Sequence, residues 1–156
     1  MQRHRLVRVG IEGLRFEAIH YTSTPSEKPR LHGHSFRVDV VVEGWPDKHG
    51  LLIDFRSLRS ILEDRLREWD EAVILPVDAS TRFEGPFSVK VKRVRGEATT
   101  ENIACTILDE TLNAILEAAT GLVTGVRVRV WESYDRYAEC IELLKAYPQD
   151  NTSADS

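Results

Sequence analysis

The chain lacks the features that mark several large classes of protein. Its 156 residues include only 2 cysteines and 1 methionine, and no apolar run approaches the roughly 20 residues that cross a bilayer. Two cysteines are too few for a disulfide-rich secreted scaffold. The N-terminus also lacks the apolar core of a signal peptide. We therefore expect a cytoplasmic protein without a membrane partner.

A strong excess of charge of one sign is missing as well. The 21 basic residues oppose 25 acidic ones, which leaves a net charge of −4. This balance argues against a general nucleic-acid binder. The hydrophobic share of 42% and the charged share of 29% are ordinary for a globular protein. We expect one domain over residues 1–147 and a disordered polar tail over residues 148–156.

The two cysteines, Cys105 and Cys140, lie far apart in the sequence and within apolar segments. Free cysteine behaves as a small hydrophobic side chain and is among the most buried residue types. We therefore expect two buried thiols rather than a disulfide.

Hydrophobic periodicity predicts an α+β fold. Asp54 is a plausible N-cap for one helix, and Thr99 or Thr100 caps a second that ends before Gly121. Period-2 alternation predicts strands over 4–12 with an extended continuation to 20, and over 35–43, 126–131 and 137–144, with a possible short strand over 89–92. Gly10 and Gly13 indicate a bulge or bend in the first strand. The expected architecture is an antiparallel four-stranded sheet with both helices on one face.

The most informative pattern is a concentration of histidine. His20, His32 and His34 are three of the five histidines in the chain. His32 and His34 share one face of an extended strand, and Gly33 adds no side chain between them. If the segment that ends at His20 pairs alongside, three imidazoles converge. Three imidazoles and one open position are typical of a catalytic zinc site, although His-x-His also occurs as solvated surface residues.

Five segments together resemble one known family. They are Phe16-x-Ala18-x-His20, Leu31-His32-Gly33-His34-Ser35-Phe36, Leu52-Ile53-Asp54-Phe55, Thr99-Thr100-Glu101-Asn102-Ile103-Ala104 and Val130-Trp131-Glu132-Ser133. Their order and spacing resemble the 6-pyruvoyl-tetrahydropterin synthase family, which includes 6-carboxy-tetrahydropterin synthase of the queuosine pathway. The resemblance covers nearly the whole chain.

The resemblance implies the tunnelling fold, in which strands from several subunits close a barrel. It implies a homo-oligomer, either one ring of three subunits or a hexamer of two stacked rings, with active sites between subunits. An exposed sheet edge in a single chain is consistent with such an assembly, because an open edge needs a partner.

The resemblance also implies roles for individual residues. His20, His32 and His34 would hold zinc, and Glu132 would bind the amino group and ring N–H of a pterin. Thr99, Thr100 and Glu101 would complete the pterin slot. If no ligand binds there, Glu132 is expected to be a solvated residue at a strand end. The other three read as ordinary capping residues of a helix.

Two departures from the family pattern concern proton transfer. The family carries a cysteine base shortly before His-Gly-His, but here residues 26–30 read Ser-Glu-Lys-Pro-Arg. Glu27 could replace that base if burial raised its pKa, with Lys28 as the rival and a solvated loop as the alternative. The family also transfers protons through an Asp-His pair after the first helix. Here the corresponding residues are Asp70 and Glu71, so the histidine is missing. Glu71 either relays protons in its place or is a surface residue.

These observations favour a zinc-dependent lyase that processes a pterin. Its expected substrate is 7,8-dihydroneopterin triphosphate or a related dihydropterin, and its expected reaction is side-chain cleavage to 6-hydroxymethyl-dihydropterin. Lys28 and Arg30 could bind the triphosphate. One alternative is a non-catalytic homologue that binds zinc and a pterin or purine. Another is an oligomer that keeps the metal only for stability.

Overall fold

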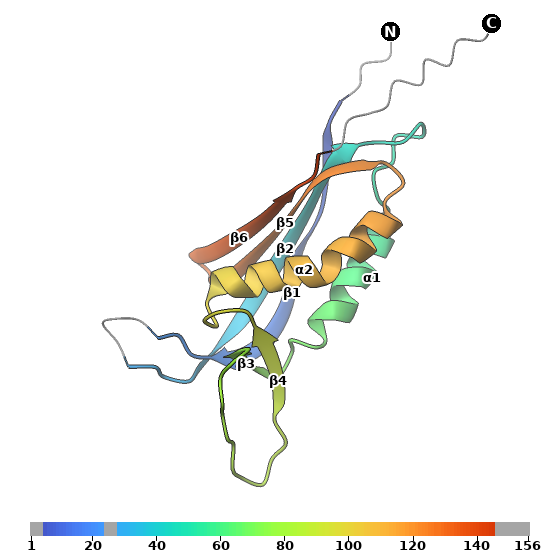
Figure 1. Ribbon diagram of the computed structural model, residues 1–156. Helices are drawn as coiled ribbons and strands as arrows, with labels where there is room; N and C mark the ends of the chain where they lie inside the picture. Colours follow the sequence, from blue (N-terminus) through green and yellow to red (C-terminus); the bar gives the residue numbers. More distant parts are fainter. Residues whose placement is uncertain (1–4, 24–27, 146–156) are drawn as a thin grey trace, which may run out of the picture.

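A computed structural model describes residues 5–23 and 28–145 of the chain. One six-stranded sheet runs through it in the order β4-β3-β1-β2-β5-β6, and both helices lie across the same face (Figure 1). Two predictions, the role of Glu27 and the disordered tail over 148–156, concern residues outside these ranges.

The predicted α+β class and the two helices on one face are confirmed, but the four-stranded antiparallel sheet is wrong. The elements are β1 (Val7–His20), β2 (His32–Trp45), α1 (Phe55–Leu66), β3 (Ala72–Pro76), β4 (Lys90–Val94), α2 (Thr100–Ala118), β5 (Leu122–Ser133) and β6 (Arg136–Leu143). β3 joins β1 in parallel, and β4 extends the sheet in parallel beyond β3. All five residues of β3 are buried, so the strand lacks the alternation that identifies a half-exposed strand.

The long pairing of β1 with β2 contains the predicted irregularity. The register shifts between Ile11 and Leu14, and Gly13 adopts a positive φ of 77°. A left-handed conformation of this kind favours glycine. The carboxylate of Asp39 accepts a hydrogen bond from the Gly13 backbone N–H at 2.8 Å, which fixes the bulge in place.

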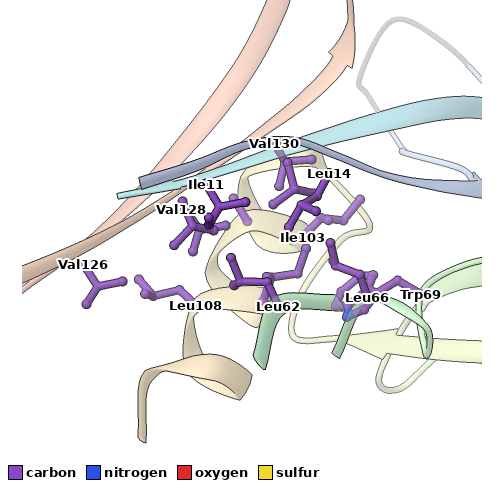
Figure 2. Packing of buried hydrophobic residues seen from close by; sticks show 14 of the residues in the cluster. Ile11, Leu14, Leu62, Leu66, Trp69, Ile103, Leu108, Val126, Val128 and Val130 are labelled. Atoms are coloured by element: carbon purple, nitrogen blue, oxygen red, sulfur yellow. The ribbon is translucent and has the colours of Figure 1, made fainter. Parts of the chain in front are cut away.

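Both predicted helix caps are present. The Asp54 carboxylate accepts hydrogen bonds from the backbone N–H groups of Arg56 and Ser57, and the Thr99 hydroxyl accepts one from Asn102. Trp69 lies beyond the end of α1, is fully buried and donates its indole N–H to Glu110. The helices pack on the sheet through aliphatic side chains (Figure 2), among them Leu62, Leu66, Ile103, Leu108, Val126, Val128 and Val130.

The expectation of two separate buried thiols is wrong. Cys105 on α2 and Cys140 on β6 form a disulfide, with their Cα atoms 5.1 Å apart. Both residues are half-buried. Sequence distance could not reveal the bond, because it depends on α2 packing against the outer strands of the sheet.

The face of the sheet opposite the helices, here called the open face, is covered by no helix among the described residues (Figure 1). It carries charged pairs in place of a core: Arg8–Glu43, Arg37–Asp39 and Arg129–Glu139. In the part of the chain that the structure describes, neither helix is long and apolar enough to cross a membrane.

Removing the disulfide is expected to destabilise the fold. The bond joins residues separated by 35 positions, and a loop of that size corresponds to a chain-entropy effect of about 4 kcal/mol. Urea unfolding of a Cys105→Ser/Cys140→Ser variant should show a loss of this order. The wild-type protein under reducing conditions should unfold like the variant. Equal stability of variant and oxidised wild type, or two titratable thiols without reductant, would contradict the bond.

Asp39 is expected to make stability depend on pH. Burial tends to raise its pKa, but hydrogen bonds from Arg37, the Gly13 N–H and Trp131 outweigh burial and hold the pKa below its ordinary value. Such a carboxylate stabilises the fold above the unfolded-state pKa of about 3.9. That contribution is lost as the pH falls through the lower folded-state pKa. Asp39→Asn should lower the unfolding free energy by about 2 kcal/mol at pH 7.

The difference between Asp39→Asn and wild type should shrink as the pH falls below about 4. Urea unfolding curves across that range measure it. A difference that stays constant with pH would show that the charge of Asp39 does not stabilise the fold.

Candidate metal centre

The three histidines predicted to converge are brought together at one end of β1 and β2. His20 lies directly opposite His32 across the two strands, and His34 lies opposite Ala18. Their side chains project from the helix-covered face, and their ring centroids are 4.6–5.1 Å apart. One ligand atom from each of His20, His32, His34 and Glu132 lies within 4.8 Å of the others.

The donor atoms of this cluster fit a metal ion. His20 is only 1% exposed, and its Nε2 atom and that of His34 are buried without a hydrogen-bond partner among the described residues. Buried polar atoms are rarely left in this state unless something else binds them. A cation that accepts their lone pairs accounts for both atoms at once.

The second nitrogen of two rings is held by a backbone carbonyl. Nδ1 of His20 lies 2.7 Å from the carbonyl oxygen of Ala98, and Nδ1 of His32 lies 2.8 Å from that of Arg30. A carbonyl oxygen only accepts, so Nδ1 carries the proton and Nε2 presents its lone pair to the cluster. This arrangement orients metal-binding imidazoles in proteins generally.

The surroundings favour neutral imidazoles, the form that binds metals. Burial lowers the pKa of His20, and the neighbouring His32 and His34 lower it further against the opposing effects of Ala98 and Glu132. Burial also lowers the pKa of His34, where Glu132 opposes the shift while His32 and Arg136 add to it.

Glu132 reaches the cluster from the end of β5. Its Oε1 atom lies 3.4 Å from Nε2 of His34, and its Oε2 atom accepts a hydrogen bond from the Thr100 hydroxyl at 2.6 Å. The family resemblance implied that Glu132 and Thr100 share one slot, but it did not show how close the carboxylate comes to the histidines. The alternation of β5 could have shown that the Glu132 side chain lies on the same face as the histidines. Val128 and Val130 face the helices, and Glu132 is the next residue on that side.

The other residues predicted for the slot have helix-terminal roles. Thr99 is the N-cap of α2, and Glu101 is an exposed residue of its first turn. A carboxylate there stabilises the helix through its dipole. Neither residue is among the four whose ligand atoms converge.

Asp70 and Glu71 follow α1 and hold β1 in place. The Asp70 carboxylate accepts the backbone N–H of Glu17 at 2.8 Å, and the Glu71 N–H donates to the Glu17 carbonyl at 2.7 Å. Glu71 has a positive φ of 57° and lines a cavity of about 400 Å³ together with Glu17 and Ser35. Neither Asp70 nor Glu71 belongs to the converging group.

Of the two basic residues predicted to bind a triphosphate, Arg30 offers its backbone carbonyl to His32 while its side chain is exposed. Lys28 is exposed as well.

Comparison with known proteins gives a consistent family. A family model described as 6-pyruvoyl tetrahydropterin synthase matches residues 11–142. A Pyrococcus abyssi protein provisionally named 6-carboxy-5,6,7,8-tetrahydropterin synthase is 33% identical over 83% of this chain and 87% of its own length. A dihydroneopterin monophosphate aldolase from Pyrococcus furiosus is 29% identical over 75% of this chain and 82% of its own length.

Solved structures agree on the fold. The 6-pyruvoyl tetrahydropterin synthase of Plasmodium vivax superposes with a TM-score of 0.77 at 22% identity, over 90% of this chain and 99% of that one. The Caenorhabditis elegans synthase superposes with a TM-score of 0.57 at 16% identity, over 92% and 99% of the two chains.

Zinc is expected to bind at about one ion per chain and to stabilise the fold. At a free zinc concentration of about 100 times Kd, the unfolding free energy should rise by about 2.7 kcal/mol. His20→Ala and His34→Ala should each weaken binding by more than about 100-fold, because even residues that merely orient a ligand contribute 10–100-fold. Competition with a chromogenic chelator measures the affinity.

His49→Ala is the matched control, since His49 is an exposed residue in a turn. It should bind zinc like the wild type. Wild-type affinity in His20→Ala would show that the buried nitrogen is not a ligand.

Proposed function

The chain belongs to the 6-pyruvoyl tetrahydropterin synthase family, and we propose that it is a zinc-dependent lyase acting on a phosphorylated 7,8-dihydroneopterin. The proposal rests on one observation above all. Two buried imidazole nitrogens that have no hydrogen-bond partner within residues 5–23 and 28–145 lie beside a carboxylate that a threonine hydroxyl holds in place. That combination offers a metal position and a ring-binding position next to each other.

Zinc held by His20, His32 and His34 would supply a Lewis acid for the hydroxyl groups of the substrate side chain. Glu132 would bind the pterin ring, since an ionised carboxylate matches the adjacent amino and N–H donors of that ring. Thr100 donates to Oε2 and so fixes the orientation of the carboxylate. α2 delivers Thr100 and, just before its N-cap, the Ala98 carbonyl that orients His20.

Side-chain cleavage is the reaction we favour. A base takes the proton of the side-chain C2′ hydroxyl, the C1′–C2′ bond breaks, and the carbon left on the ring takes up a proton. The products are 6-hydroxymethyl-dihydropterin and a phosphorylated two-carbon aldehyde. The aldolase among the relatives supports this choice, as does the missing cysteine before His32.

Glu27 is the proposed base, with Asp70 and Glu71 assisting proton transfer. Glu27 belongs to the connection between β1 and β2, whose ends carry His20 and His32. A related Plasmodium vivax synthase has been solved as a variant lacking a glutamate described as a catalytic residue. Glu71 lines a cavity beside the end of β1. Asp70 accepts the Glu17 N–H through one carboxylate oxygen, Oδ1, and so holds the chain next to Glu71 while its second oxygen stays available.

Formation of a 6-carboxy-tetrahydropterin is the second candidate, because several of the relatives carry that provisional name. A non-catalytic homologue that binds zinc and a pterin is the third. All three use the same four-residue centre and differ in turnover and product.

We propose further that the protein is a homo-oligomer, a trimer or hexamer. β4 and β6 are the outer strands of the described sheet, and β6 exposes Tyr137, Ile141 and Leu143 on the open face. An open edge with apolar side chains of this kind needs a partner strand. A second copy of the chain is the simplest partner.

The test is anaerobic incubation of the zinc-loaded protein with 7,8-dihydroneopterin triphosphate or monophosphate, with products identified by mass spectrometry. We expect 6-hydroxymethyl-dihydropterin. Glu27→Ala should lower kcat by about 100-fold or more, the usual contribution of a general base. Glu132→Ala should mainly raise KM.

Glu84→Ala is the control, because Glu84 is an exposed residue paired with Arg82. It should leave the rate unchanged. A 6-carboxy product would assign the second candidate, and tight binding without turnover would assign the third.

A further inference from the structure

The Glu132 carboxylate points one of its two oxygens at the histidine cluster. Its Oε1 atom lies 3.4 Å from Nε2 of His34, whereas its Oε2 atom accepts the hydrogen bond from the Thr100 hydroxyl at 2.6 Å. Thr100 is buried and belongs to the first turn of α2. Its hydroxyl therefore determines which carboxylate oxygen faces the cluster.

The contact between Oε1 and Nε2 is not a hydrogen bond. Nε2 of His34 is buried and has no hydrogen-bond partner within residues 5–23 and 28–145. Two atoms that both present lone pairs repel each other at this distance unless a cation lies between them. Two ligand atoms that each lie about 2.0–2.1 Å from a tetrahedral zinc ion are about 3.3–3.4 Å apart. The separation of Oε1 and Nε2 therefore matches that of two ligands of one metal ion.

The backbone around Glu132 gives its side chain freedom to change direction. The pairing of β5 with β2 ends at Trp131, and the register of β5 with β6 shifts between Trp131 and Ser133. Irregularities of this kind re-aim side chains and are frequent beside functional sites. The Glu132 carboxylate can therefore move without a change in the pairing of the strands.

A metal ion and a pterin ring would compete for the Glu132 carboxylate. The amino group and the adjacent ring N–H of a pterin make their two-point contact with both carboxylate oxygens. An oxygen that donates a lone pair to a cation is a weaker hydrogen-bond acceptor. Each partner therefore lowers the affinity of the carboxylate for the other.

We propose that Glu132 is a fourth metal ligand in the pterin-free protein and leaves the metal when a pterin ring binds both of its oxygens. Four protein ligands close a zinc site, whereas three leave a position open for chemistry. Binding of the ring would thus open the site only when a substrate is present. The inference rests on the proposed function for the identity of the pterin, but the metal contact of Glu132 does not depend on turnover.

The first test is competition for zinc with a chromogenic chelator in the absence of pterin. Glu132→Gln should weaken zinc binding about tenfold or more. The amide oxygen can still accept the Thr100 hydroxyl, which turns the NH₂ group, a donor without a lone pair for the metal, toward the cluster. Glu132→Asp should also weaken zinc binding, because the shorter side chain keeps the charge but loses the reach.

Glu97→Gln is the matched control. Glu97 is an exposed residue outside the converging group, and its carboxylate accepts the backbone N–H of Ser23 at 3.3 Å, close to the end of β1. This variant removes one negative charge from the same end of the sheet and should bind zinc like the wild type.

Three results of the first test would overturn the inference. Wild-type zinc affinity in Glu132→Gln would show that the carboxylate is not a ligand. Wild-type affinity in Glu132→Asp, or an equal loss in Glu97→Gln, would reduce Glu132 to a nearby negative charge. Failure of the wild type to bind zinc would overturn the proposed function as well.

The second test follows the visible absorption of the cobalt(II) form, because imidazole sites accept both metals and the spectrum responds to the ligands. The added pterin is 6-methyl-7,8-dihydropterin, which has the ring donors but no side-chain hydroxyl groups. It should change the spectrum of the wild type and leave that of Glu132→Gln unchanged. It should also lower the zinc affinity of the wild type, and zinc should lower its affinity by the same factor.

Binding of this pterin with no change in the wild-type spectrum, or no binding at all, would overturn the exchange of partners. If both tests give the expected results and the wild type shows no turnover, the exchange stands while the lyase proposal fails.

Discussion

The antiparallel register of β1 and β2 is the constraint on which the metal centre depends. It sets His20 opposite His32 and Ala18 opposite His34, so three imidazoles leave the same face of the sheet. A shift of one residue would turn every side chain of a strand to the other face. The bulge at Gly13, held by the buried Asp39 carboxylate, adjusts the register before the histidines are reached.

α2 completes the centre from above the sheet. The segment at its N-terminus supplies the Ala98 carbonyl to His20 and the Thr100 hydroxyl to Glu132. The disulfide between Cys105 and Cys140 ties the same helix to β6, the neighbour of the strand that carries Glu132. The packing that stabilises the fold thus also sets the distance between the ring-binding carboxylate and the histidines. A substitution that destabilises α2 is therefore also expected to disturb the metal centre.

The sequence predicted the features of the fold that depend on residues close together in the chain. Alternation identified the strands on either side of the histidines, and the caps at Asp54 and Thr99 marked both helix starts. β3 was missed because its five residues are all buried, and its parallel pairing depends on a crossover through α1. The disulfide, the 3.4 Å approach of Glu132 to His34 and the bond from Glu17 to Asp70 each join residues distant in sequence. Spacing alone carries no information about such contacts.

The most direct test of the account is X-ray absorption at the zinc edge of the metal-loaded protein, with and without 7,8-dihydroneopterin. The account predicts three imidazole nitrogens at about 2.0–2.1 Å and an oxygen in the remaining position. Addition of the pterin should change the oxygen contribution and leave the three imidazoles in place. Fewer than three imidazoles, or a sulfur ligand, would contradict a centre built from His20, His32 and His34.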